Sequence, residues 1–448
     1  MIRIFGTNGV RGITNTELTI ETVKCLASSS ASLLGKNISL GMDARTSSPM
    51  FKEAAASGLL SIGCTIHYMG VLPTPTLQYM TKQLNLDGGI MITASHNPPE
   101  FNGVKVIASD GVEIPRDLEE KIENLYFSGG PKPVSWDKIG KIKHVEVIDP
   151  YIEAVLSHVE LSLIKEKKLK IALDPGNGVT ALTAPKTARI LGAKVNTINS
   201  EIDGTFPGRG SEPRPEKLDA LCTLVKATES DFGLAFDGDG DRSVFVDEKG
   251  EVIWGDRSFG ILARAFLEKH PGAVIATAVS SSKVLEDIAK EFGGSVHWTK
   301  VGAPDVSRAM VNNKIQFGGE ENGGIMYGPH HPVRDGTMAL ALMAELLTQK
   351  AAPLSKLLEE LPKYAQAKSR INCPNNKKQV TLEKLLEKVE APIIDTIDGV
   401  KLTYRDGSWI LIRPSGTEPI FRLYAEAPTK NRVMKIIEKH EDILKEII

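Results

Sequence analysis

The stretch Phe232-Gly-Leu-Ala-Phe-Asp-Gly-Asp-Gly-Asp-Arg242 decides the fold and the chemistry that we expect of this chain. Its first five residues, Phe232–Phe236, form an apolar run that predicts a buried strand. Asp237, Asp239 and Asp241 follow at alternate positions, separated by glycines that let the backbone point all three carboxylates at one spot. Three negative charges this close together repel one another unless a cation neutralises them. Because the ligands would all be oxygens, with no His or Cys nearby, the turn predicts a site for a hard ion such as Mg²⁺.

Two other interpretations of this acidic turn stay open at this point. Asp237, Asp239, Asp241 and Glu248 have the spacing of the first, third, fifth and twelfth ligands of a calcium loop. Arg242, however, stands at the sixth position, where that loop needs glycine, and the flanks are typical of strands rather than helices. The other interpretation is a solvated acidic turn without a ligand.

Composition places the chain among ordinary multidomain proteins of a reducing compartment. Its 448 residues predict roughly two to four domains. A hydrophobic content of 41% and a net charge of −2 offer no bulk attraction for nucleic acid or an anionic membrane. We expect a cytoplasmic protein without a signal peptide, a membrane span, a disulfide framework or a zinc site. The four cysteines are scattered: Cys25, Cys64, Cys222 and Cys373.

Apolar runs and amphipathic runs alternate along most of the chain, which predicts an α/β fold with mostly parallel sheets. The alternation passes three times, so we expect three related α/β domains at residues 1–150, 151–250 and 251–363. After a linker near Leu361-Pro-Lys363, strand-like runs dominate and predict a separate α+β domain at 364–448. The expected elements include strands 38–42, 89–93, 232–236 and 400–404, and helices 17–34, 180–191, 337–349 and one from 432.

Polar residues follow an apolar run at Thr93-Ala-Ser-His-Asn-Pro-Pro99. Ligands of open α/β sheets bind outside the carboxyl ends of the strands, so Ser95 at such a strand end could be reactive, with His96 beside it. A capped turn explains the same residues equally well. Lys105, a little further along, could move a proton or be merely solvated.

Two glycine-rich loops have the residues of a sugar-phosphate site. Gly318–Gly324 surrounds Glu320, Glu321 and Asn322, whose carboxylate and amide groups suit vicinal hydroxyls. Arg413-Pro-Ser-Gly-Thr-Glu-Pro419 has the arginine, hydroxyls and free N–H groups of a phosphate nest. Plain hairpin turns remain the alternative for both loops. Phe5–Gly12 and Lys300-Val-Gly302 are weaker signals, and His330-His331 is interpreted as exposed or structural.

Five motifs in this order resemble the α-D-phosphohexomutase family over nearly the whole chain. They are Gly6-Thr-Asn-Gly-Val-Arg-Gly12, Thr93-Ala-Ser-His-Asn-Pro98, Asp237-Gly-Asp-Gly-Asp-Arg242, Gly319-Glu-Glu-Asn-Gly323 and Arg413-Pro-Ser-Gly-Thr-Glu-Pro419. The resemblance implies three related α/β domains and a C-terminal domain resembling the TATA-binding-protein fold, with their loops around one central cleft.

The resemblance also implies a role for each matched residue. Ser95 resembles the phosphoserine that donates and recovers the phosphoryl group, and with Asp237, Asp239 and Asp241 it would hold Mg²⁺. Lys105 would be a proton carrier. The other matched positions are the active-site residues Arg11, His96 and Lys300, the group-contacting Arg242, the sugar readers Glu320 and Asn322, and the phosphate grip Arg413, Ser415, Gly416, Thr417 and Arg422.

The activity implied is an intramolecular phosphotransfer between hexose 6-phosphate and hexose 1-phosphate, with a hexose 1,6-bisphosphate as intermediate. Many members have serine where Asn322 stands, and the Glu-Glu-Asn-Gly-Gly form is similar to archaeal mutases for mannose and glucose phosphates. Phosphoglucosamine mutase is the alternative; a sugar phosphatase and a non-catalytic sugar-phosphate sensor are rivals. The expected partners are small hexose phosphates, and the sequence leaves the oligomeric state open, a homo-oligomer included.

Overall fold

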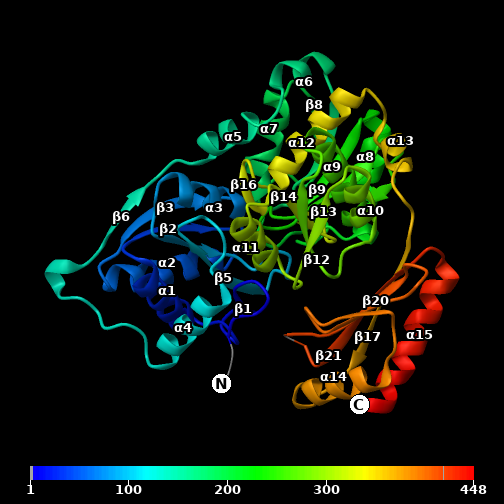
Figure 1. Ribbon diagram of the computed structural model, residues 1–448. Helices are drawn as coiled ribbons and strands as arrows, with labels where there is room; N and C mark the ends of the chain where they lie inside the picture. Colours follow the sequence, from blue (N-terminus) through cyan, green and yellow to red (C-terminus); the bar gives the residue numbers. More distant parts are fainter. Residues whose placement is uncertain (1–3, 417) are drawn as a thin grey trace.

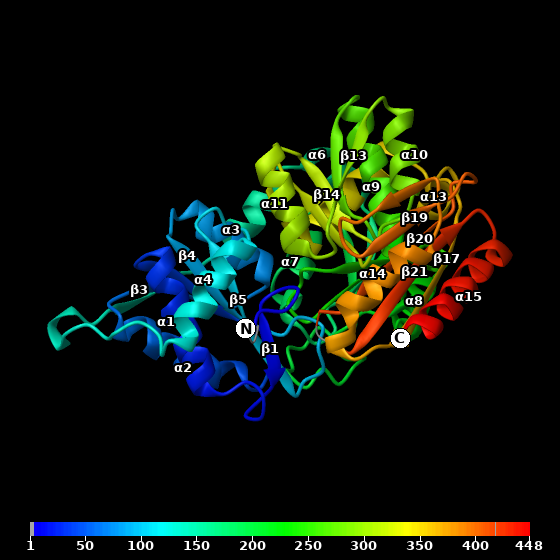
Figure 2. The same ribbon diagram turned by 60° about the horizontal axis from the view of Figure 1, so that its bottom comes forward.

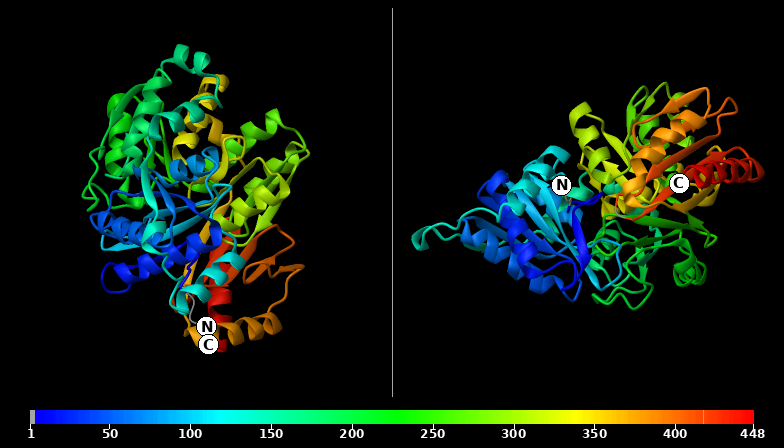
Figure 3. Two further views of the ribbon diagram at one scale, coloured as in Figure 1. Left: turned by 90° about the vertical axis from the view of Figure 1, so that its left-hand side faces the viewer. Right: turned by 90° about the horizontal axis from the view of Figure 1, so that it is seen from below.

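The computed structural model describes residues 4–416 and 418–448, and these form four domains, each built on one sheet (Figure 1). Domain I lies to one side of domains II and III, and domain IV lies apart from domain I on another side (Figures 1 and 3). The hydrophobic cores explain this arrangement. Domains II and III share one continuous core, whereas domains I and IV each have a core of their own. Among the described residues, none of the helices is long and apolar enough to cross a membrane.

The first three sheets repeat one strand pattern. In each sheet, three strands pair in parallel. Two further strands extend the sheet at one edge, each pairing antiparallel with the strand before it in the sheet. Their orders are β1-β5-β4-β2-β3 with β6 added, β11-β10-β9-β7-β8 and β16-β15-β14-β12-β13. The expectation of three related mixed α/β domains is therefore confirmed: each sheet joins parallel strands to antiparallel strands at one edge.

The bounds of these elements are as follows. The strands are β1 (Val10–Ile13), β2 (Asn37–Met42), β3 (Thr65–Val71), β4 (Gly88–Ile92), β5 (Phe101–Ala108), β6 (Lys141–His144), β7 (Lys170–Asp174), β8 (Lys194–Thr197), β9 (Phe232–Phe236), β10 (Ser243–Asp247), β11 (Val252–Ile253), β12 (Val274–Ala278), β13 (Ser295–Thr299), β14 (Phe317–Glu320), β15 (Gly324–Tyr327) and β16 (His331–Arg334). The helices are α1 (Ile20–Leu34), α2 (Ser48–Ser61), α3 (Thr74–Gln83), α4 (Arg116–Phe127), α5 (Ile148–Leu156), α6 (Leu161–Lys167), α7 (Ala184–Ile190), α8 (Asp219–Thr228), α9 (Gly255–Lys269), α10 (Val284–Glu291), α11 (Ala303–Asn313), α12 (Gly336–Lys350) and α13 (Leu354–Glu359).

One expected helix is wrong in its extent. The segment predicted as a helix over 180–191 contains a 3₁₀ turn, Val179–Leu182, and then the separate helix α7. Pro185 stands in the first turn of α7, where its missing N–H costs nothing, so the helix starts there instead of running through.

Domain IV is an antiparallel sheet of order β17-β21-β20-β19-β18, with helices α14 and α15. Its elements are β17 (Ala365–Asn372), α14 (Lys378–Lys388), β18 (Ile393–Asp395), β19 (Val400–Thr403), β20 (Trp409–Pro414), β21 (Ile420–Ala427) and α15 (Lys430–Ile447). Figure 2 shows this sheet to the right of β1 of domain I, with α15 along its outer edge.

A small contact around the partly buried side chain of Lys401 joins domain IV to domain III. Lys401 lies between the rings of Trp298 and Trp409, 4.6 and 4.3 Å from their centroids, and its Nζ donates to the carbonyl of Val279 at 2.8 Å. Burial lowers the pKa of Lys401 to about 8. The backbone N–H of Lys283 also donates to Glu426, at 2.8 Å. These contacts hold domain IV against domain III in this structure.

Candidate active site

Three loops with the same place in the repeated fold carry the predicted chemistry. The loop with Ser95 joins β4 to β5, the acidic loop 237–242 joins β9 to β10, and the loop with Asn322 joins β14 to β15. Each therefore links the last parallel strand of its sheet to the first antiparallel strand. Because the three domains share this pattern, packing them together brings equivalent loops to one place.

Ser95 meets the acidic loop directly. Its Oγ donates to Asp237 Oδ2 at 2.8 Å, and both side chains are fully buried. Ser95 has a φ of +52°, a left-handed conformation that is costly for a residue with a side chain. A Cβ on Gly238 would lie only 2.7 Å from the carbonyl oxygen of Ser95, so only glycine permits this approach of the two loops.

The three carboxylates form a site that could hold a metal ion. One ligand oxygen from each of Asp237, Asp239 and Asp241 can be chosen so that all lie within 4.8 Å of one another. Thr74 and Lys105 donate to Asp239 Oδ2 at 2.6 and 2.7 Å, and Lys105 also donates to Asp241 Oδ2 at 2.9 Å. Oδ1 of Asp239 and Oδ1 of Asp241 are buried and have no hydrogen-bond partner. Buried anionic oxygens without hydrogen-bond partners suit the binding of a cation that prefers oxygen ligands.

The charges in this cluster shift the pKa values of the aspartates in opposite directions. Burial, and next the neighbouring carboxylates of Asp241 and Asp239, raise the pKa of Asp237 well above its usual value. Burial would also raise the pKa of Asp241, but Arg334 and Lys105 outweigh it and lower the pKa. Although burial opposes its charge, Asp239 and Asp241 raise the pKa of Lys105, so it is an ammonium here.

His96 lies beside Ser95. Its Nδ1 is 3.3 Å from Ser95 Oγ. Burial, and next the charges of Arg242 and Arg11, lower the pKa of His96 well below its usual value. The imidazole is therefore neutral at physiological pH.

Arg11 and Arg242 line the same place from two domains. Arg11 Nη1 donates to Asn97 Oδ1 at 2.8 Å, and burial lowers the pKa of Arg11 to about 10. The backbone N–H of Arg242 donates to Asp237 Oδ1 at 3.0 Å, and its guanidinium lies 3.7 Å from Glu212. The structure thus gathers Arg11, Ser95, His96, Lys105, the three aspartates and Arg242 at one site.

The Asn322 loop joins this site through an ion pair that the sequence patterns do not reveal. Arg334 Nη1 donates to Glu320 Oε2 at 3.0 Å, and Arg334 Nη2 donates to Asp241 Oδ2 at 2.5 Å. Burial raises the pKa of Glu320, and the nearby charge of Arg334 offsets only part of that rise. Oδ1 of Asn322 is buried and has no partner, so it is available to a ligand.

The predicted phosphate grip lies on domain IV. Arg413 on β20 is in register with Arg422 on β21, and Arg422 is in register with Arg370 on β17, so three guanidinium side chains share one row. Arg370 is a further candidate that the motif alone does not show. Ser415 and Gly416 lie in the turn after Arg413, with Ser415 buried and Gly416 exposed. Thr417 lies outside the described residues.

Lys300 is exposed, and the residue after it is linked to the grip on domain IV. The backbone N–H of its neighbour Val301 donates to Asp398 Oδ2 at 3.0 Å, and Arg413 Nε lies 3.0 Å from that same oxygen. Within residues 4–416 and 418–448, no hydrogen bond or ion pair joins Arg413 or Arg422 to Ser95 or the aspartates. The grip and the acidic cluster are thus separate in this structure.

Arg45 is another functional candidate that sequence reasoning missed. Its guanidinium is buried and donates to four carbonyls of the Ser95 loop, those of Ser95, Asn97, Pro98 and Phe101, at 2.6–2.9 Å. Its Nε also donates to Asp43 at 3.1 Å. The available signal was Asp43-Ala-Arg45 directly after the strand 38–42, at the same sheet edge as Ser95.

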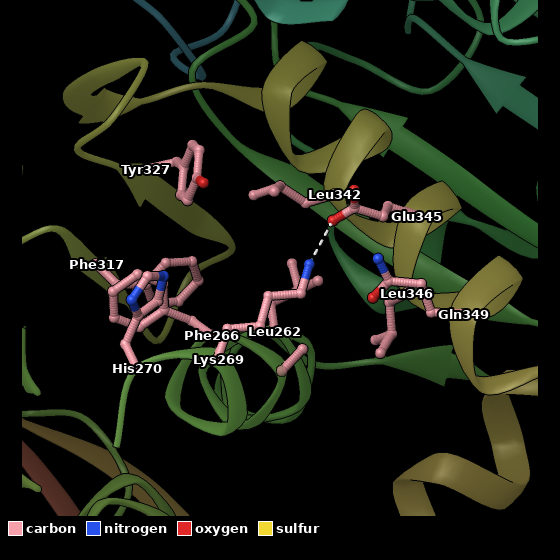
Figure 4. Close-up of a pocket in the computed structure, with 11 residues that line it drawn as sticks. Leu262, Phe266, Lys269, His270, Phe317, Tyr327, Leu342, Glu345, Leu346 and Gln349 are labelled. Carbon is pink, nitrogen blue, oxygen red and sulfur yellow. Dashed lines mark hydrogen bonds and ion pairs between the residues drawn. The ribbon is translucent and has the colours of Figure 1, made fainter. Parts of the chain in front are cut away.

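The pair His330-His331 and a small cavity in domain III lie away from the acidic cluster. His330 and His331 are buried, so they are structural rather than exposed; His330 stacks on Tyr79 at a centroid distance of 4.5 Å. A cavity of about 40 Å³ lies between α9 and α12, crossed by the ion pair of Lys269 with Glu345 (Figure 4). The cavity shares no residue with the Ser95 site, so we place the chemistry at the acidic cluster.

A buried serine on a carboxylate cluster that could hold a metal ion, set in repeated α/β domains, is an arrangement suited to phosphoryl transfer. The chain matches four domain descriptions of one family, phosphoglucomutase/phosphomannomutase: α/β/α domain I at residues 2–132, domain II at 149–250, domain III at 254–364 and the C-terminal domain at 369–443.

Individual proteins agree with this match. The chain is 40% identical to a phosphoglucomutase/phosphomannomutase of Thermococcus kodakarensis, covering 100% of both chains. It is 41% identical to a phosphoglucosamine/phosphogalactosamine mutase of Sulfurisphaera tokodaii, covering 99% of both. A crystal structure of a phosphoglucomutase/phosphomannomutase family protein from Burkholderia thailandensis superposes with a TM-score of 0.90 at 27% identity, covering 99% of this chain and 97% of the other.

The chain therefore belongs to the phosphoglucomutase/phosphomannomutase family, the α-D-phosphohexomutases. It is an enzyme of the isomerase class, a phosphohexomutase.

Proposed function

We propose that this enzyme interconverts the 6-phosphate and the 1-phosphate of glucose or mannose through a phosphorylated Ser95. The observation that supports this most directly is the 2.8 Å hydrogen bond from Ser95 Oγ to Asp237 inside the buried carboxylate cluster. A nucleophile on a cation site can give and receive a phosphoryl group whose charge is offset. The T. kodakarensis relative carries the corresponding name.

In the first transfer, the bond from phosphorus to Ser95 Oγ breaks while a sugar hydroxyl oxygen bonds to that phosphorus. The product is a hexose 1,6-bisphosphate and an unmodified serine. The sugar hydroxyl gives its proton to a base, and Ser95 Oγ takes up a proton as it leaves phosphorus. His96, whose Nδ1 lies 3.3 Å from Ser95 Oγ, is placed to exchange a proton with the serine oxygen. Lys105, kept charged by Asp239 and Asp241, suits a donor to phosphoryl or leaving oxygens.

In the second transfer, the bisphosphate has turned around and its other phosphoryl group passes to Ser95 Oγ. The same protein groups must then bind the sugar in two opposite orientations. Glu320 and Asn322 would bind hydroxyls, and the arginine row with Arg413 and Arg422 would bind the phosphate that is not transferred. Closure of domain IV would bring the grip toward Ser95 and keep water from the phosphoserine.

Asp237, Asp239, Asp241 and the phosphorylated Ser95 would hold Mg²⁺, which offsets negative charge on the group in transfer. The residues that remain around them have separate tasks. Arg11 anchors the Ser95 loop through Asn97, and Thr74 fixes one oxygen of Asp239.

Phosphoglucosamine mutase is a second candidate function. It is favoured by the 41% identity to the S. tokodaii mutase of amino sugars. Asn322 lies in the loop proposed to bind the sugar, so the choice between a hydroxyl and an amino group would be made there.

The test is a product analysis by ³¹P NMR. Enzyme with Mg²⁺ and a catalytic amount of hexose 1,6-bisphosphate is mixed in turn with glucose 1-phosphate, mannose 1-phosphate and glucosamine 1-phosphate. We expect conversion to the 6-phosphate without inorganic phosphate, loss of conversion in Ser95→Ala, and normal conversion in the exposed control Ser57→Ala. Release of inorganic phosphate without isomer would contradict the proposal and indicate a phosphatase.

A further inference from the structure

Arg334 is the side chain that connects the metal cluster to the sugar-binding loop. It ends β16, its side chain is 5% exposed, and none of the five sequence motifs includes it. One arm of its guanidinium reaches Asp241 at 2.5 Å and the other reaches Glu320 at 3.0 Å. A single planar group therefore holds one carboxylate from domain II and one from domain III.

The surrounding backbone leaves Arg334 little freedom. A Cβ on Gly324 would lie 2.2 Å from Arg334 Cδ and 2.7 Å from its Cγ, so the glycine makes room for the stem of the arginine. The next residue, Asp335, caps α12 and accepts a hydrogen bond from Tyr151 at 2.6 Å. Gly336 then donates its N–H to the carbonyl of Gly240 in the acidic loop at 3.2 Å. Both the stem and the base of Arg334 are thus fixed.

This contact determines which carboxylate oxygens remain available. Arg334 and Lys105 both occupy Oδ2 of Asp241, and Oδ1 of Asp241 stays buried without a partner. Arg334 likewise occupies Oε2 of Glu320, which leaves the other oxygen of that carboxylate for a ligand hydroxyl. A guanidinium can hold both in a defined orientation because its N–H groups are arranged in a rigid fork.

We propose that Arg334 is a positioning residue that aims Asp241 at the metal ion and Glu320 at the sugar, so that both binding events depend on one guanidinium. The sugar half of this inference rests on the proposed function, whereas the metal half does not.

The test separates orientation from charge. Arg334→Lys keeps the charge but cannot span both carboxylates, and Gly324→Ala keeps the arginine but displaces its stem. Arg264→Lys is the control, since Arg264 makes a comparable bidentate pair with Glu291 on the surface of the same domain. Metal affinity is measured by calorimetric titration of Mg²⁺ into metal-stripped protein, sugar recognition by KM, and folding by thermal unfolding.

We expect both site variants to bind Mg²⁺ about tenfold more weakly and to show a KM about tenfold higher, while the control matches the native protein. In the Glu320→Gln background, Arg334→Lys should add little to KM, because it acts through Glu320. Folded variants with native metal affinity would overturn the proposal, and so would weakened metal binding with an unchanged KM. If the native enzyme itself forms no isomer, the proposed function fails, and the titration still decides the metal half.

Discussion

Replacing Arg45 with methionine should slow phosphoryl transfer without touching any group that contacts the substrate. The guanidinium holds four carbonyls of the Ser95 loop, and Ser95 itself has a φ of +52°. A left-handed backbone at a serine costs about 1–2 kcal/mol, which these hydrogen bonds offset. Without them the loop can relax, so the reactive conformation should become about 5–30 times less populated.

The same substitution should also destabilise the fold. Asp43 would remain buried without its cation, and breaking a buried pair in this way costs about 3–5 kcal/mol. Arg45→Lys is the matched control, because it keeps a charge near Asp43 but cannot reach four carbonyls.

The assay measures kcat in the mutase reaction and, separately, the rate at which hexose 1,6-bisphosphate phosphorylates the protein. We expect both rates to fall together in Arg45→Met and in Arg45→Lys, with the larger loss of thermal stability in Arg45→Met. A folded Arg45→Lys protein with the native kcat and phosphorylation rate would refute the reasoning, since it would show that the clamp does not set the position of Ser95.

Three further predictions follow from the site and the domain contacts. Arg413→Met should raise KM by about tenfold or more, because it removes a charge-assisted contact of roughly 1.5–3 kcal/mol with the substrate phosphate; an unaltered KM would count against the grip. Chelation of divalent ions should abolish turnover, and added Mg²⁺ should restore it; full activity in excess chelator would contradict the metal site. Because unfolding takes up a proton at Lys401 between its lowered pKa of about 8 and the ordinary value of 10.5, the free energy of unfolding of the native protein relative to Lys401→Met should increase by roughly 2–3 kcal/mol from pH 7 to pH 10. Denaturant titrations at both pH values check this, and a constant difference between the two proteins would disprove it.

The parts of the fold that local patterns encode could be predicted. The strand Phe232–Phe236 has the predicted bounds because a short apolar run between polar turns is buried as a strand. The meeting of Ser95 with Asp237 was expected from the family resemblance, and both residues do lie at strand ends of similar α/β units.

Contacts between distant residues could not be predicted in the same way. Arg45 and Arg334 lie outside the glycine-rich motifs, and their function depends on carbonyls and carboxylates that only the packed domains bring within reach. The antiparallel pairing of β1 with β5 was missed for a similar reason, because periodicity shows which residues are buried and not which strands pair.

The central claim is that Ser95 carries the phosphoryl group between the two positions of the sugar. The most direct measurement incubates the enzyme with hexose 1,6-bisphosphate labelled with ³²P, isolates the protein, maps the label by peptide mass analysis, and then adds unlabelled hexose 1-phosphate. We predict label on Ser95 alone, followed by its transfer to the sugar and not to water. Label on another residue, or its release as inorganic phosphate before sugar is added, would contradict the account.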